Sequence, residues 1–158
     1  IATDARLAVA VSGGVDSITL AHLAWHNHLR DNLVFLTVDH RLRESSTREA
    51  QQVAATLHSW GAPCDILTWD GASAGSSMQE RARHARYDLL RDAARHENCT
   101  HVLLGHHADD QAETFWMRLA DGSGLTGLAA MSDVRADADI MWVRPLLDVT
   151  RSDIAAYA

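Results

Sequence analysis

A pair of glycines flanked by hydroxyl and carboxylate side chains follows the first apolar run of the chain. Glycines let the backbone turn tightly and approach a ligand, and a helix that follows them presents free N–H groups and the positive end of its dipole. The stretch therefore predicts a site for an anion, most simply phosphate or pyrophosphate. The plain alternative is a strand-to-helix turn capped by serine or aspartate. The residues of the stretch are Ser12, Gly13, Gly14, Val15, Asp16 and Ser17.

Two common phosphate-binding loops do not match this stretch. The dinucleotide-binding pattern GxGxxG is absent because Val15 follows the glycine pair, and a Walker A loop is excluded because the chain contains no lysine. All 14 basic residues are arginines, so no step of a reaction can depend on a lysine side chain of this chain.

Polar side chains also follow two further apolar runs. Asp39 and His40 come directly after LVFLTV (33–38), and the polar stretch HHADD (106–110) comes directly after HVLLG (101–105). Histidines and carboxylates at the end of a strand can position a cation, a triphosphate or an amine.

The second of these stretches allows several interpretations. Asp109 and Asp110 are candidates for binding, but both are also favoured at a solvated helix start by the helix dipole. His106 is a candidate for contacting a nucleotide. A zinc site from His106, His107 and Asp109 is disfavoured, because adjacent residues seldom converge on one metal ion.

Arginines outnumber acidic residues in the segment ERARHARYDLLRDAAR (80–95). A locally basic stripe in an acidic chain can contact RNA phosphates or ATP. Arg83 and Arg86 are three residues apart and share one helix face, which makes them the best functional candidates. The outer arginines are equally well explained as ion-paired residues on a solvated helix.

The predicted strands alternate with predicted helices along the chain, and this order would position these residues. The predicted strands are continuous apolar runs, which is typical of a parallel sheet with helices on both faces. We therefore predict a doubly wound α/β fold with about five strands, mainly parallel. Ligands bind beyond the carboxyl ends of such strands, so the polar clusters should meet at one edge of the sheet. The predicted strands are 7–11, 33–38, 64–69, 101–105 and 141–146.

Three predicted helices carry a capping pair at their start. The pairs are Ser46 with Glu49, Ser77 with Glu80, and Thr150 with Asp153. The tryptophans, Trp116 included, are expected to be packing residues.

Length and composition predict one domain spanning 1–158. The 158 residues carry a net charge of −7, which argues against a general nucleic-acid coat. No apolar stretch is long enough to span a membrane, and Cys64 and Cys99 form no CxxC pair, so we expect a cytoplasmic protein without a disulfide framework. The chain begins without methionine and ends inside a helical pattern, which predicts a fragment of a longer protein.

The stretch SGGVDS resembles SGGxDS, the signature of the PP-loop ATP pyrophosphatases, at every defined position. The resemblance implies an adenine nucleotide α-hydrolase-like fold and a reaction at the α-phosphate of ATP that releases pyrophosphate. It implies that residues 12–17 hold ATP together with Mg²⁺, for which Asp16 is the candidate ligand. His40 and His106 are further candidates for contacting the nucleotide.

Four longer segments resemble the tRNA(Ile)-lysidine synthetase family in order along the chain. TVDHRLR (37–43) is similar to its VDHGLR segment, and ERARHARYDLL (80–90) to its EAxARxxRYxxL helix. GHHADDQAETFWMRLADGSGLTGLAAM (105–131) and VRPLLDVTRSDIAAYA (143–158) resemble its GHHxDDxxETxLMRLxRGSGxxGLxxM and RPLLxxxRxxIxxYA regions.

This resemblance implies a concrete reaction. ATP would adenylate the oxygen on carbon 2 of the wobble cytidine of tRNA(Ile) with a CAU anticodon, and the ε-amine of free lysine would displace AMP to form lysidine. The residues it implies for positioning lysine and cytosine are Asp39, Arg83, Arg86, Asp109 and Asp110. One of these acids or His40 would accept the proton of the amine. The resemblance is compatible with a homodimer, and it implies C-terminal tRNA-binding domains that this chain lacks.

Two positions depart from the family pattern, and other functions compete. Arg41 stands where the family has glycine, and Asp121 stands where a basic residue precedes GSG.

A PP-loop tRNA-thiolating enzyme is disfavoured because its chemistry calls for paired cysteines. A small-molecule synthetase of the superfamily would lack the GHHADD segment, and a non-catalytic nucleotide-binding domain would not need to keep Asp39 or that segment.

Overall fold

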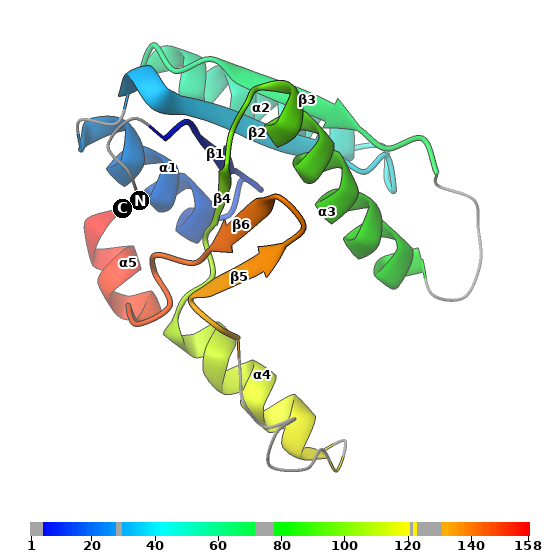
Figure 1. Cartoon of the computed structure of the whole chain (residues 1–158), viewed down its shortest axis with the longest axis vertical. Helices are drawn as coiled ribbons and strands as arrows, with labels where there is room; N and C mark the ends of the chain where they lie inside the picture. The colour runs from blue at the N-terminus through cyan, green and yellow to red at the C-terminus, as the bar shows by residue number, and fades with distance from the viewer. Residues whose placement is uncertain (1–4, 28–29, 72–77, 121, 123–130) are drawn as a thin grey trace.

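Six strands form one sheet in a computed structural model of the chain, which describes residues 5–27, 30–71, 78–120, 122 and 131–158 (Figure 1). The strand order is β3-β2-β1-β4-β6-β5, and every pair is parallel except the antiparallel pair β5·β6. The predicted, mainly parallel α/β sheet is thus confirmed. The strands are β1 (Leu7–Ala10), β2 (Leu33–Asp39), β3 (Cys64–Thr68), β4 (His101–Leu104), β5 (Val134–Asp137) and β6 (Ile140–Val143).

The prediction of about five strands missed β5. Its sequence, VRAD, contains no apolar run, and its side chains are exposed or half-buried. It forms through pairing with β6 across a turn in which Ala138 has a φ of 55°. The last predicted strand also ends earlier than expected, at Val143.

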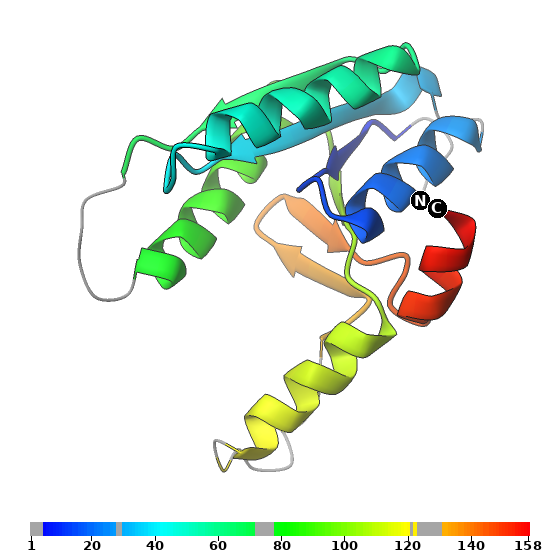
Figure 2. The ribbon, with the colours of Figure 1, turned by 180° about the vertical axis from the view of Figure 1, so that it is seen from behind.

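Helices cover both faces of the sheet, as predicted (Figures 1 and 2). One core lies between the sheet and α1, α2 and α5, and a second core lies between the sheet and α3. Successive residues of β1 serve the two cores in turn, because Leu7 and Val9 belong to the first core and Ala8 and Ala10 to the second. The helices are α1 (Val15–His26), α2 (Ser46–Ser59), α3 (Met78–His96), α4 (Ala108–Ala120) and α5 (Arg151–Tyr157), with a 3₁₀ turn at Arg30–Asn32.

Helix α4 extends away from the sheet and buries none of its side chains among the described residues (Figures 1 and 2). The expectation that Trp116 is a packing residue is therefore wrong, because this side chain is 64% exposed. None of the helices in the described part of the chain is long and apolar enough to cross a membrane.

The capping pairs have different outcomes. Thr150 caps α5 and accepts a hydrogen bond from the backbone of Asp153, as predicted. The pair Ser46 with Glu49 is wrong, because α2 is capped by Ser45 without a side-chain hydrogen bond. Glu49 instead pairs with Arg43. Ser77 lies outside the described residues.

Parallel pairing brings the carboxyl ends of the central strands to one edge of the sheet. Ala10, the last residue of β1, is in register with Leu36 of β2 and Leu104 of β4. The polar residues that follow these three strands therefore lie close together at that edge. The predicted convergence of the three clusters is confirmed.

Candidate functional site

The loop between β1 and α1 is organised by one buried hydroxyl group. Ser17 Oγ accepts hydrogen bonds from the backbone N–H and the hydroxyl of Ser12, both at 3.1 Å, and donates to the carbonyl of Gly14 at 2.9 Å. Gly14 is the N-cap of α1 and offers no side chain to the first amides of the helix. Those N–H groups are therefore left for a ligand, which is the arrangement that binds phosphate at helix N-termini.

Two glycines keep this loop in place. Gly13 has a φ of 89°, and a Cβ there would lie 2.9 Å from Val53 Cγ2 of α2. Gly105 follows β4, and a Cβ there would lie 3.0 Å from Ser17 Cα. The loop is thus wedged between α2 and the end of β4, and both contacts require the absence of a side chain.

Val15 and Asp16 begin α1 at the open side of this loop. Val15 is 41% exposed. Asp16 Oδ1 is buried and has no hydrogen-bond partner among the described atoms. This oxygen fits the proposed role as a Mg²⁺ ligand, since Mg²⁺ in nucleotide sites is held by one or two carboxylates together with phosphate oxygens. The described residues contain no set of three or more His, Cys, Asp or Glu side chains arranged to hold a metal ion by themselves.

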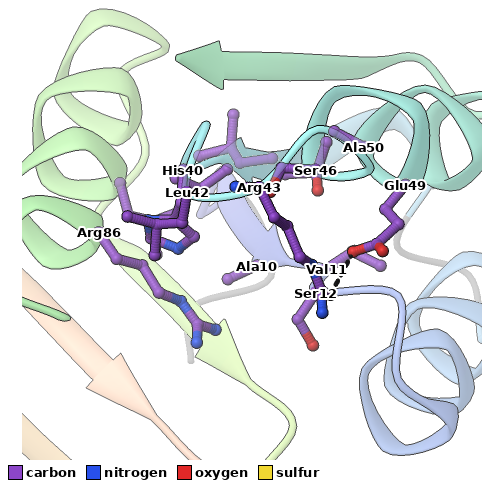
Figure 3. A pocket seen from close by; sticks show the side chains of 14 residues that line it. Ala10, Val11, Ser12, His40, Leu42, Arg43, Ser46, Glu49, Ala50 and Arg86 are labelled. Carbon is purple, nitrogen blue, oxygen red and sulfur yellow. Dashed lines mark hydrogen bonds and ion pairs between the residues drawn. The ribbon is translucent and has the colours of Figure 1, made fainter. Parts of the chain in front are cut away.

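A cavity of about 370 Å³ opens beside the loop, which we call the loop cavity (Figure 3). Ser12, His40 and Arg86 line it, as expected for a ligand site at the strand ends. Arg43 and Glu49, which were not predicted as site residues, also line it and form an ion pair at 2.7 Å beside Ser12. Its size falls in the ordinary range for small-molecule sites.

A second cavity of about 250 Å³ adjoins the first, and we call it the base cavity. His40 and Arg86 line both cavities, and Arg83 and His106 line the second. Arg83 and Arg86 thus share one face of α3, as predicted, and both face the strand ends. The remaining lining residues of the base cavity are Leu42, Gln79, Ala82 and Tyr87.

The histidines of these cavities are held in the neutral form. Burial lowers the pKa of His106 to about 4, and Arg144 adds to the effect. Burial, followed by the charge of Arg86, also lowers the pKa of His40. The Nδ1 atoms of both histidines are buried without a partner among the described atoms. Each ring therefore has hydrogen-bonding capacity left for a ligand.

Asp39 is used by its own turn. Its carboxylate is 2% exposed and accepts from the backbone N–H of Arg41 at 3.0 Å and from the hydroxyl of Thr47 at 2.7 Å. Arg41, at the position where the resembling family has glycine, has a φ of 48°. The turn thus keeps a glycine-like backbone at Arg41, and Asp39 holds it by hydrogen bonds. The other departure, Asp121, lies outside the described residues.

The carboxylates after β4 surround His107, a residue that the sequence analysis left out of the site. The ring of His107 is 5% exposed and lies 3.7 Å from Asp16 and 3.6 Å from Asp110 through Nε2, and 3.5 Å from Asp109 through Nδ1. Asp110 accepts from the backbone of His107 at 2.9 Å, and Asp109 accepts from the backbone of Arg151 at 2.8 Å. These two acids therefore cap local structure, and His107 links them to the loop.

The chain matches the family model of the PP-loop domain over residues 2–158. It is 46% identical over 154 residues to the tRNA(Ile)-lysidine synthase of Bradyrhizobium diazoefficiens, covering 95% of this chain and 43% of that protein. With the enzyme of the same name from Ruegeria pomeroyi it is 47% identical, covering 96% of this chain and 37% of that protein. The chain thus spans less than half the length of these relatives.

Two solved structures have the same fold. A U34-tRNA thiolase from Methanococcus maripaludis with a [4Fe-4S] cluster superposes with a TM-score of 0.80 at 17% identity, covering 97% of this chain and 56% of that one. An NH₃-dependent NAD synthetase from Campylobacter jejuni superposes with a TM-score of 0.58 at 19% identity, covering 95% of this chain and 61% of that one.

Proposed function

Because the chain belongs to the PP-loop domain family, we propose that it is the ATP-using domain of a tRNA(Ile)-lysidine synthase. Such a ligase would join lysine to carbon 2 of the wobble cytidine of tRNA(Ile) with a CAU anticodon and release AMP and pyrophosphate. One observation carries the proposal: the loop cavity and the base cavity are neighbours, because His40 and Arg86 line both. A nucleotide held by the loop and a base bound next to it would meet at these two residues.

In the first step, residues 12–17 hold the pyrophosphate end of ATP. A bond forms between the cytosine oxygen on carbon 2 and the α-phosphorus, while the bond from the α-phosphorus to the bridging oxygen breaks and pyrophosphate leaves. The amides at the start of α1 and the guanidinium of Arg86 stabilise the negative charge that develops on the phosphates. Mg²⁺, held by Asp16 together with phosphate oxygens, would neutralise further charge on the leaving group.

In the second step, the lysine ε-amine attacks carbon 2, the bond from carbon 2 to the adenylated oxygen breaks, and AMP leaves. Asp110, whose carboxylate lies beside His107, provides negative charge for an ammonium group. Arg83 lines the base cavity from α3 and would help to position the cytosine there. His40, which lines both cavities and is neutral, can accept the proton that the amine loses. Asp39 and Asp109 act as positioning residues, because both are bonded to the backbone of neighbouring turns.

A PP-loop tRNA thiolase is the nearest alternative, and the cysteines argue against it. Cys64 begins β3 and Cys99 precedes β4, so both lie at the end of the sheet opposite to the loop. Burial raises the pKa of Cys64 to about 12 and that of Cys99 to about 11, so neither is a ready thiolate.

The deciding experiment incubates the complete protein with ATP, Mg²⁺, radiolabelled lysine and tRNA(Ile) bearing the CAU anticodon. We expect incorporation of lysine that depends on the wobble cytidine, together with release of AMP and pyrophosphate. AMP release without incorporation would refute the assignment, and nucleotide binding without AMP release would identify a non-catalytic nucleotide-binding domain. We also propose that the protein acts in the cytoplasm. We further propose that it forms a homodimer, and sedimentation equilibrium would measure this oligomeric state.

A further inference from the structure

Five arginines line a third cavity of about 450 Å³ on the α3 face of the sheet. They come from α3, from α4, from β5 and from the residue that follows β6, so segments distant in sequence build one basic surface. We call this surface the arginine groove. The arginines are Arg83, Arg91, Arg118, Arg135 and Arg144, and Asp88 is the one acidic residue among the described residues that line the cavity.

Part of this positive charge is held in place by ion pairs. Asp137 accepts from Arg91 at 2.9 Å and from Arg135 at 3.2 Å through one carboxylate oxygen, which holds the guanidinium groups of α3 and β5 beside each other. Arg144 is 6% exposed, donates to the carbonyl of Ser132 at 2.6 Å, and has a buried Nε without a partner among the described atoms. The arginines still outnumber the carboxylates, in a chain whose net charge is −7. The groove is therefore a local exception to an acidic protein.

An aromatic ring lies in the groove between two of these cations. The guanidinium carbons of Arg83 and Arg135 lie 5.6 Å and 5.9 Å from the ring centroid of Tyr87. Trp142 packs against the same ring edge to face, with centroids 4.8 Å apart. Tyr87 thus holds two cations of the groove through cation–π contacts, and Trp142 supports its ring.

The groove adjoins the candidate site. Arg83 and Tyr87 line both the arginine groove and the base cavity, and His40 and Arg86 line both the base cavity and the loop cavity. A strand lying in the groove could therefore place one base next to the nucleotide without leaving the protein surface.

We propose that the arginine groove binds the phosphodiester backbone of the RNA that presents the reacting base, with Tyr87 holding Arg83 and Arg135 in place for these contacts. This inference rests on the proposed function. A single small anion, such as the carboxylate of lysine, needs one or two of these cations, whereas a run of phosphates uses cations spread over four segments. Phosphate contacts of this kind position an RNA without reading its sequence.

The test uses Arg118 and Arg135, which line neither the loop cavity nor the base cavity. The complete protein, the two single variants Arg118→Gln and Arg135→Gln, and the double variant are titrated with a fluorescent RNA hairpin carrying a CAU loop. Arg48→Gln is the matched control, because Arg48 is exposed on α2, which packs on the opposite face of the sheet. Thermal unfolding shows that each variant is folded.

We expect the double variant to bind the hairpin about tenfold more weakly or worse, since charge-assisted hydrogen bonds contribute strongly to such contacts. The slope of log K against log salt should become shallower by about 1.4, since each lost contact to single-stranded RNA removes about 0.7. The affinity for ATP and the KM for lysine should not change. The proposal is overturned if hairpin affinity and salt slope are unchanged, if Arg48→Gln weakens binding equally, or if the KM for lysine rises instead.

The two proposals can fail separately. If the protein makes no lysidine but binds the hairpin through Arg118 and Arg135, the reaction assignment falls and the RNA groove stands. If lysidine forms and the double variant binds and reacts as the unaltered protein does, the groove assignment falls and the reaction stands.

Discussion

Lowering the pH should destabilise the protein through His106, and the substitution His106→Gln should remove that effect. Burial, then the charge of Arg144 and, more weakly, those of the arginines on α3, lowers the pKa of His106 to about 4 from the 6.5 that is usual for a free histidine side chain. Between these two values the unfolded chain takes up a proton that the folded protein refuses. The stability that depends on neutral His106 is therefore fully present above the unfolded pKa and is lost as the pH falls toward 4.

The magnitude follows from the size of this difference. At about pH 5 the unfolded histidine is mostly protonated and the folded one mostly neutral, which corresponds to about 2 kcal/mol of lost stability relative to neutral pH. Because the side chain is half-buried, solvent screening reduces this to about 1–2 kcal/mol.

Urea unfolding of the unaltered protein and of His106→Gln, each at neutral pH and at about pH 5, measures this contribution as the difference between the two pH effects. His58→Gln, which removes an exposed histidine of α2, is the control and should lose as much stability on acidification as the unaltered protein. The reasoning is refuted if His106→Gln also loses as much as the unaltered protein. Pyrophosphate should raise the pKa of His106 by bringing negative charge to the same edge, which an NMR titration of its ring protons would detect.

Three glycine-related positions give further predictions. Gly13→Ala forces a side chain into a φ of 89° and to 2.9 Å from Val53, so we expect a loss of about 1–3 kcal/mol in thermal unfolding and loss of ATP binding by calorimetry; unchanged ATP affinity would contradict this. Gly105→Ala presses on the backbone of Ser17 at 3.0 Å and should weaken pyrophosphate binding at least tenfold, by about 1.4 kcal/mol, while far-UV circular dichroism stays unchanged. Arg41→Gly should leave ATP turnover intact, and Arg41→Val should be about 1–2 kcal/mol less stable than Arg41→Gly in urea unfolding, because glycine adopts a φ of 48° without strain and a β-branched residue does not; equal stability of the two variants would refute the strain argument.

The central strands could be predicted from the sequence because of how they are buried. All residues of β1 are buried, and β2 is buried apart from Val38, so both must be continuous apolar runs. The exposed strand β5 carries no such signal, since its formation depends on pairing with β6. Local sequence patterns therefore predict strands whose own side chains are buried, and they miss an exposed strand that forms only by pairing with a neighbouring strand.

The same distinction applies to the site. The position of the loop residues 12–17, His40 and His106 at one edge of the sheet could be predicted, because the residues that follow parallel strands must meet there. Arg86 could be predicted separately, from its spacing with Arg83 on one helix face. Glu49 and Arg43 could not, because their approach to Ser12 depends on how α2 packs against the sheet. The choice between adjacent histidines also needs the structure, since the sequence says nothing about which ring faces the base cavity.

The carboxylates at the carboxyl ends of the central strands repel bound phosphates less strongly than their number suggests. Asp39, Asp109 and Asp110 each accept a hydrogen bond from a backbone N–H group, of Arg41, Arg151 and His107 respectively. Part of their negative charge is therefore balanced by these N–H groups. The arginines of α3, by contrast, line the cavities. An acidic chain can therefore present a positive surface where ATP and RNA would meet. Its carboxylates stabilise the turns that contain the histidines, and its arginines line the cavities between those turns.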